Sequence, residues 1–225
     1  ALGQKRQTSI KGRIYEDVER QTHPTHLLDT IRPLIVKTDE VPQQWERLLL
    51  PALAENDPIF DAIPRLRRYL YTALWSLAAG LTNTAIIEEK LKNDRFDLVM
   101  TYFDGTDTLA HRFWLMREPV TLIAKRLEQH GIDPAWAPTL KAYFGRVLDG
   151  MYVAVDRWIG RIRKAAGSDA TLLIVSDHGW GSLPPGDKAP FAHVPFDGEH
   201  RLEGTFLAQG PLIKKGKHPH LTLYD

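Results

Sequence analysis

Two kinds of segment alternate along this chain, and their hydrophobic periods distinguish them. Short, continuous apolar runs occur at residues 96–102 (FDLVMTY), 171–176 (TLLIVS) and 204–208 (GTFLA). Such runs are typical of strands that are buried on both faces, as in a sheet that helices cover on both sides. Because long helical patterns lie between the runs, the sequence predicts an α/β fold with a mixed, mostly parallel sheet flanked by helices.

Helical spacing is clearest in two segments. Leucines recur every three or four positions from Leu66 to Leu81, after Pro64, a residue type that suits the first turn of a helix. Apolar side chains keep the same spacing over residues 140–162, which predicts one long helix. Another helix is expected from residue 115 to near Gly131.

The first 60 residues have a different character. Short helices are expected at 25–33 and 42–53, separated by prolines, and we interpret residues 1–60 as a helical cap or insertion. Residues 61–225 would then form the main α/β unit. Within that unit, residues 181–200 hold four prolines and show no hydrophobic period, so they predict a long loop of the kind that often carries function.

Composition limits the classes of protein and site. The 225-residue chain has 29 Lys and Arg against 28 Asp and Glu, and it has no cysteine. This charge balance argues against a nucleic acid partner, and no apolar run approaches the roughly 18 residues of a membrane span. The lack of thiols excludes disulfides, a cysteine nucleophile and thiolate zinc sites. Any bound metal must therefore use His, Asp or Glu.

Ligand-type side chains gather at the ends of the predicted strands. Asp107 and His111 follow the first run and are four positions apart, which places both on one face of a helix. Asp177 and His178 directly follow the second run, and His200 precedes the third. Because ligands bind at the carboxyl ends of strands in open α/β sheets, we expect these side chains to share one crevice.

Each of these features also has a simpler explanation. Asp107 and His111 could be a capping or surface pair, and Asp177 and His178 could form a turn with an exposed imidazole. His193 competes with His200 as a loop ligand. Taken together, the pairs favour divalent metal ions, and the residue types favour zinc, manganese or similar ions.

Three blocks of the sequence resemble the alkaline phosphatase superfamily, in its type I phosphodiesterase and nucleotide pyrophosphatase branch. The blocks are FDLVMTYFDGTDTLAHRFW (96–114), TLLIVSDHGWGS (171–182) and GEHRLEGTFLAQGPLIKKG (198–216). Their order and separation also fit, and the resemblance covers about residues 60–225. It implies an alkaline-phosphatase-like sheet, of which residues 61–225 would be the C-terminal portion.

The resemblance also implies a reaction and its cofactors. Members of this branch use two metal ions, usually zinc, for in-line phosphoryl transfer from small phosphate esters. By resemblance, one ion would be held by Asp107, His111 and His200. The other would be held by Asp177 and His178, with a further aspartate and a Thr or Ser nucleophile. Trp180 lies beside the second pair and is expected to shape the substrate pocket.

One part of the family pattern has no counterpart in the sequence. The nucleophile segment, a Thr or Ser that opens a helix, cannot be identified, because Thr22-His-Pro-Thr25 lacks the landmarks that surround it in relatives. We therefore expect a chain that is truncated at both ends. Three hypotheses follow: the C-terminal part of a phosphate ester hydrolase, a non-catalytic metal-binding fragment, or a sulfatase or phosphomutase relative. The leaving group, compartment and oligomeric state are not indicated.

Overall fold

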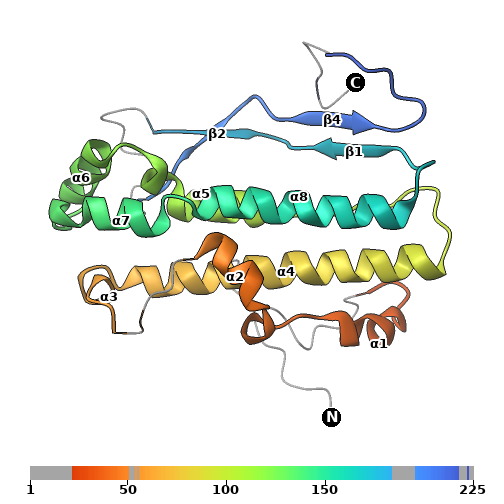
Figure 1. The fold of residues 1–225 in the computed structure, drawn as a ribbon, viewed down its shortest axis with the longest axis horizontal. Helices are drawn as coiled ribbons and strands as arrows, with labels where there is room; N and C mark the ends of the chain where they lie inside the picture. The colour runs from red at the N-terminus through yellow and green to blue at the C-terminus, as the bar shows by residue number, and fades with distance from the viewer. Residues whose placement is uncertain (1–21, 51–53, 55, 184–195, 218–221, 223–225) are drawn as a thin grey trace.

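One long helix, α4 (Arg65–Asn93), lies at the centre of the fold. Its predicted leucine stripe is largely buried against α8 (Val147–Ala166), and the two helices run in the same direction (Figure 1). The Trp158 ring of α8 lies so close to Gly80 of α4 that a larger side chain at Gly80 would overlap the ring. The structure is a computed structural model that describes residues 22–50, 54, 56–183, 196–217 and 222.

The other helices pack around this pair. They are α1 (Leu27–Ile31), α2 (Gln43–Leu49), α3 (Ile59–Ala62), α5 (Gly105–Phe113), α6 (Val120–Gln129) and α7 (Ala137–Phe144), with short 3-10 turns at Arg32–Leu34, Thr38–Glu40, Trp114–Arg117 and Pro134–Trp136. Trp45 and Phe60 share one apolar core with α4 and α8. Helices α1 and α2 lie within the two segments, 25–33 and 42–53, for which short helices were predicted. Residues 1–21, 51–53 and 55 lie outside the described chain, and a separate cap stays a prediction.

The helix predicted over residues 140–162 is two helices. α7 ends at Phe144 and α8 begins at Val147, with Gly145 between them. A β-carbon on Gly145 would lie 2.6 Å from the Lys141 carbonyl oxygen and 3.0 Å from that of Met116, so the chain passes very close to its neighbours there. The apolar spacing continues across the break because both helices bury the same side of the chain.

The strands form two small antiparallel pairs. β1 (Leu172–Val175) pairs with β4 (Phe206–Gln209), and β2 (Gly179–Gly181) pairs with β3 (Glu199–Arg201). The predictions for 171–176 and 204–208 are therefore close to the observed strands. The expected mostly parallel sheet is not found, since both strand pairs in the described part of the chain are antiparallel.

The prediction of a buried strand at 96–102 is wrong. This segment has no regular structure, and its side chains are open to solvent, with Leu98 74% and Met100 84% exposed. A strand needs a partner for its backbone hydrogen bonds, and an apolar run alone does not reveal whether a partner is present.

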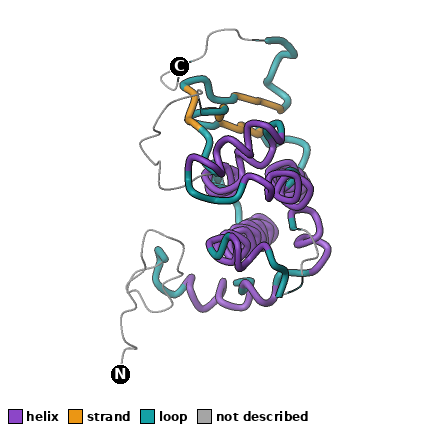
Figure 2. The backbone as a smooth tube through the Cα atoms, turned by 90° about the vertical axis from the view of Figure 1, so that its left-hand side faces the viewer, coloured by secondary structure: helices purple, strands orange, loops and turns teal. Residues whose placement is uncertain are grey.

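All four strands lie outside the main core. The fully buried side chains belong to the helices, to Ile63 between α3 and α4, and to Phe196. By contrast, β1 alternates between half-buried and exposed residues, and three of the four residues of β4 are exposed. Both views show the helices on one side of the strands only (Figures 1 and 2). Burial of β1 and β4 on two faces was therefore a wrong prediction, because the second covering layer is not found among the described residues.

Helix α4 also corrects the expectation about membrane spans. By length and composition alone, it is long and apolar enough to cross a membrane, because residues 69–87 carry no charged side chain. In the structure, however, this stretch lies between α8, α5 and the N-terminal helices and supplies much of the core. The buried side of α4 is thus accounted for by packing within the protein.

Candidate metal centre

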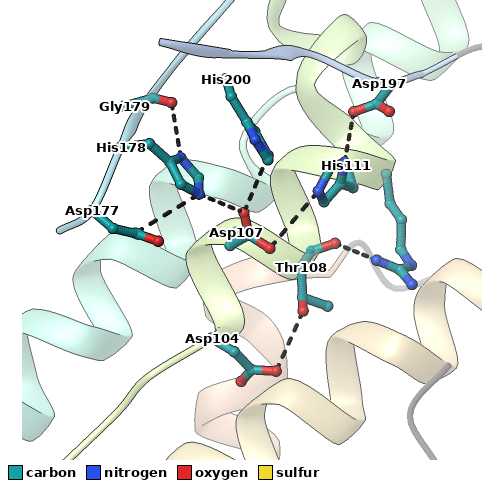
Figure 3. Close-up of polar contacts among 10 residues, drawn as sticks. Asp104, Asp107, Thr108, His111, Asp177, His178, Gly179, Asp197 and His200 are labelled. Carbon is teal, nitrogen blue, oxygen red and sulfur yellow. Dashed lines mark hydrogen bonds and ion pairs between the residues drawn. The ribbon is translucent and has the colours of Figure 1, made fainter. Parts of the chain in front are cut away.

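Helix α5 carries the residue around which the site is built. Asp107 lies in its first turn, and His111 follows one turn later on the same face, as predicted (Figure 3). The helix begins at Gly105, where a β-carbon would lie 2.9 Å from the Met151 sulfur of α8. Glycine therefore allows the start of α5 to rest closely on α8, which fixes the position of Asp107.

Three imidazoles surround the Asp107 carboxylate (Figure 3). The Nε2 atoms of His178 and His200 lie 3.4 and 3.7 Å from Asp107 Oδ1. The Nε2 atom of His111 lies 3.8 Å from Oδ2. The two carboxylate oxygens therefore face different imidazoles.

The Asp107 Oδ1 atom has the surroundings of a metal ligand. It is buried and accepts no hydrogen bond from the residues that the structure describes. Ligand atoms of Asp107, His178 and His200 all lie within 4.8 Å of one another. Ligands of a tetrahedral zinc ion, with bonds of about 2.0–2.1 Å, are separated by about 3.3 Å, close to the observed spacing. One carboxylate and neighbouring imidazoles thus fit a divalent cation.

The strands bring two histidines to α5. His178 immediately precedes β2, and His200 lies in β3 opposite Trp180 in the β2–β3 register. The two imidazole rings are stacked, with centroids 4.0 Å apart and an angle of 21° between planes. The short antiparallel pair therefore holds both Nε2 atoms on one side of the two strands, toward Asp107.

The orientation of His178 is fixed by a backbone acceptor. Its Nδ1 lies 3.1 Å from the Gly179 carbonyl oxygen. A carbonyl can only accept, so Nδ1 carries the hydrogen, and the Nε2 lone pair of the neutral ring faces Asp107. This is the tautomer that an Nε2 metal ligand requires.

Trp180 packs against all three histidine rings. Its ring meets His111 and His200 nearly at right angles, with centroids 4.6 and 4.5 Å apart, and it meets His178 at 5.8 Å. It also stacks on Trp114 at 6.1 Å. The structure thus places Trp180 behind the imidazoles, and its role in a substrate pocket stays a prediction.

The geometry groups the predicted ligands differently from the sequence. His178, expected with Asp177 on a second ion, lies with Asp107 and His200. The Asp177 side chain is 78% exposed, with Oδ1 3.8 Å from His178 Nε2. His193 lies outside the described residues, so its candidacy is untested.

Sequence reasoning missed Asp197. Its side chain is 3% exposed, and Oδ1 accepts a hydrogen bond from His111 Nδ1 at 3.0 Å. The residue lies three positions before His200, next to the block used for the resemblance, but its type alone gives no sign that it is buried. The one available signal was the neighbouring Phe196, a large apolar residue within the predicted loop. This side chain is fully buried in the structure, and Asp197 next to it is buried as well.

Negative charge and burial shape the electrostatics around Asp107. Burial raises the pKa of Asp104, and the nearby Asp107 charge adds to this effect. The pKa of the Tyr102 hydroxyl is also raised, first by desolvation and then by the Asp107 charge. Burial lowers the pKa of the Arg112 guanidinium. The site is thus a partly desolvated region in which a cation would relieve carboxylate repulsion.

Helices that present a carboxylate with one buried oxygen to imidazoles from α5 and from the β2–β3 pair define a candidate metal-dependent enzyme. The sequence model of one family, type I phosphodiesterase / nucleotide pyrophosphatase, matches residues 10–217. The chain belongs to this family of hydrolases, which confirms the resemblance seen in the three blocks. Comparison with curated proteins and with solved structures gave no match.

Proposed function

We propose that this chain provides the metal-binding part of a metal-dependent hydrolase of small phosphate esters, of the phosphodiesterase or nucleotide pyrophosphatase type. The observation that carries the proposal is the buried Asp107 Oδ1, which accepts no hydrogen bond from the described residues and faces two imidazole Nε2 atoms. Family membership supports the reaction class.

The proposed ligands are Asp107, His111, Asp177, His178 and His200. Imidazole and carboxylate groups suit zinc, with manganese as the alternative. Asp107 directs Oδ1 toward His178 and His200 and Oδ2 toward His111, which supports two cation positions. When bound, divalent cations would lower the pKa of the attacking group and stabilise charge on the phosphoryl oxygens.

The chain's own residues would prepare this site in two ways. Hydrogen bonds at Nδ1 orient His178 and His111 with Nε2 toward the Asp107 carboxylate. Trp180 covers one side of the three imidazoles and would limit the access of water there. Desolvation strengthens the electrostatic interactions within such a site.

The nucleophile is not assigned. Thr22 donates a hydrogen bond to the Thr25 carbonyl oxygen at 3.1 Å, within the turn that precedes α1. Helix α1 lies on the far side of the helical layers from the strands in both views (Figures 1 and 2). The Thr22-His-Pro-Thr25 segment is therefore not proposed for this role.

Elemental analysis of the purified chain, together with hydrolysis of bis-p-nitrophenyl phosphate with and without zinc or manganese, tests the proposal. We expect bound metal in the wild type and its loss in His178→Ala. His130→Ala is the matched control, because His130 ends α6 and contacts none of the proposed ligands. Metal-stimulated hydrolysis would support the enzyme, metal without turnover would support a non-catalytic metal-binding unit, and absence of both would contradict the proposal.

A further inference from the structure

The environment of Asp197 distinguishes it from the other carboxylates near the site. Its side chain is 3% exposed, although an isolated buried carboxylate is costly. The adjacent Phe196 is fully buried, and its carbonyl oxygen accepts a hydrogen bond from the Leu115 amide at 3.0 Å. The backbone at position 197 is therefore fixed next to the end of α5, independently of the Asp197 side chain.

The Asp197 side chain meets His111 on the ring edge that points away from Asp107 (Figure 3). His111 Nδ1 lies 3.0 Å from Asp197 Oδ1. An ionised carboxylate can only accept a hydrogen bond, so the Nδ1 atom of the neutral ring must carry the hydrogen. The lone pair is then on Nε2, which faces Asp107 Oδ2.

The distance on the Asp107 side agrees with this tautomer. His111 Nε2 and Asp107 Oδ2 are 3.8 Å apart, which is too far for a hydrogen bond. This separation is close to that of two atoms that bind the same cation. The ring of His111 is thus held between a carboxylate that accepts its hydrogen and a carboxylate that would share a metal.

His178 provides a comparison within the same site. Its Nδ1 donates to the neutral carbonyl of Gly179, whereas that of His111 donates to a charged acceptor. A carboxylate partner raises the basicity of the opposite ring nitrogen more than a carbonyl does, and it fixes the ring orientation. Of the two imidazoles, His111 should therefore have the Nε2 atom that donates its electron pair to a metal more strongly.

We infer that Asp197 is a positioning residue, which holds His111 in the Nδ1–H tautomer with Nε2 directed at the metal position beside Asp107. The inference rests on the proposed metal function, but its tautomer component concerns the metal-free protein. A competing structural role is also defined: Asp197 lies near Arg112, and its charge could simply offset that guanidinium.

Nitrogen-15 NMR of the histidine rings in the metal-free protein tests the tautomer. Spectra are recorded at about pH 8.5, where imidazoles are neutral. We expect the wild-type signal of His111, assigned by its absence in His111→Gln, to show a protonated Nδ1. Asp197→Asn keeps an acceptor oxygen and should retain this tautomer, whereas Asp197→Ala should redistribute it. An Nε2–H signal in the wild type would overturn the inference.

Zinc affinity, measured by competition with a chromophoric chelator, provides the second readout. Asp197→Ala should weaken binding by about 10–100-fold, and Asp197→Asn should recover part of the loss. Glu88→Gln is the control, because it removes a carboxylate that pairs with Arg161 between α4 and α8. If Asp197 only offsets Arg112, both Asp197 variants will keep wild-type zinc affinity and tautomer, which overturns the inference.

Two controls distinguish a failure of the inference from a folding defect and from a failure of the proposed function. If Asp197→Ala does not fold, as judged by circular dichroism, the comparison of Asp197→Asn with the wild type still decides, because the loss of charge alone should weaken zinc binding. If the wild type binds no zinc, the proposed function fails, whereas the tautomer of His111 is still measured without metal.

Discussion

Asp104, at the start of α5, is a partly buried residue that can carry a negative charge. It is the N-cap residue of the helix, but its side chain accepts no capping hydrogen bond from the backbone. Its Oδ2 instead lies 3.4 Å from the Thr108 hydroxyl, and burial raises the pKa of the carboxyl above the ordinary value of 3.8. The ionised group is therefore held in the folded protein at a cost in stability.

Asp104→Asn should stabilise the metal-free protein at neutral pH. The Asp104 carboxyl ionises near pH 3.8 in the unfolded chain but only at higher pH in the folded protein. Between these two pKa values, a rise in pH therefore lowers the free energy of unfolding of the wild type. The advantage of the variant should shrink as the pH falls toward 3.8. Urea unfolding at pH 7 and near pH 4 measures this difference, and an advantage that is equal at both pH values would contradict it.

Replacement of Asp107 should weaken metal binding but stabilise the metal-free protein. Replacement by Asn removes the negative charge that faces three imidazoles, and we expect bound metal and most turnover to be lost. In the metal-free protein at alkaline pH, the same change should raise the free energy of unfolding by about 1 kcal/mol, because the buried Oδ1 atom, which accepts no hydrogen bond from the described residues, no longer carries negative charge. Metal analysis and urea unfolding test the two halves, and lower metal-free stability would refute the second.

At the scale of elements, close helix packing depends on glycine. A β-carbon on Gly150 of α8 would overlap the Leu48 carbonyl oxygen of α2, so the two helices meet backbone to backbone. Gly160, three turns further along α8, has nothing within 4 Å of the same position. One helix thus contains a glycine that packing requires and another that it does not.

Gly150→Ala and Gly160→Ala form a matched pair. The first should destabilise the protein by about 1–3 kcal/mol, because α2 must move away from α8. The second should stabilise it by about 0.5–1 kcal/mol through the better helix propensity of alanine. Urea unfolding of both variants provides the measurement, and equal effects would show that the α2–α8 contact is not tight.

Local periodicity predicted the helices but not the partners of the strands. The leucine stripe of α4 is visible in the sequence because its spacing follows from helix geometry. The segment 96–102 has the composition of a buried strand, yet its burial depends on a neighbour that no local pattern specifies. The site follows the same rule: Asp107 and His178 could be identified by chemical type, whereas their grouping depends on how β2 and β3 lie on α5.

At the scale of the whole molecule, large apolar side chains are exposed in three segments next to or within the strands. Large exposed residues occur in 96–102, in β1 and in β4; they include Leu98, Val99, Met100, Tyr102, Leu173, Val175, Phe206 and Leu207. Among the described residues, each strand pair has two strands only, so each also has outer edges. Exposed apolar surface next to strand edges promotes association.

The chain should therefore self-associate as its concentration rises. Leu98→Lys combined with Met100→Lys should shift sedimentation velocity profiles toward the monomer and reduce binding of a hydrophobic dye, with little change in unfolding midpoint, because both side chains are already exposed. Tyr71→Lys on α4, where the wild-type side chain is 53% exposed, is the control for added charge. Association that is unchanged in the double variant would contradict this prediction.

The division of the ligands between two layers has a consequence for motion. Asp107 and His111 lie on α5, which is anchored in the core, whereas His178 directly precedes β2 and His200 lies in β3, and these short strands add little buried surface. Without a cation, we expect the β2–β3 pair to open locally more readily than the helices, and its amides to exchange with solvent through such openings. A cation bound between the layers would hold β2 and β3 against α5. Metal occupancy would therefore slow the hydrogen exchange of the amides in this strand pair.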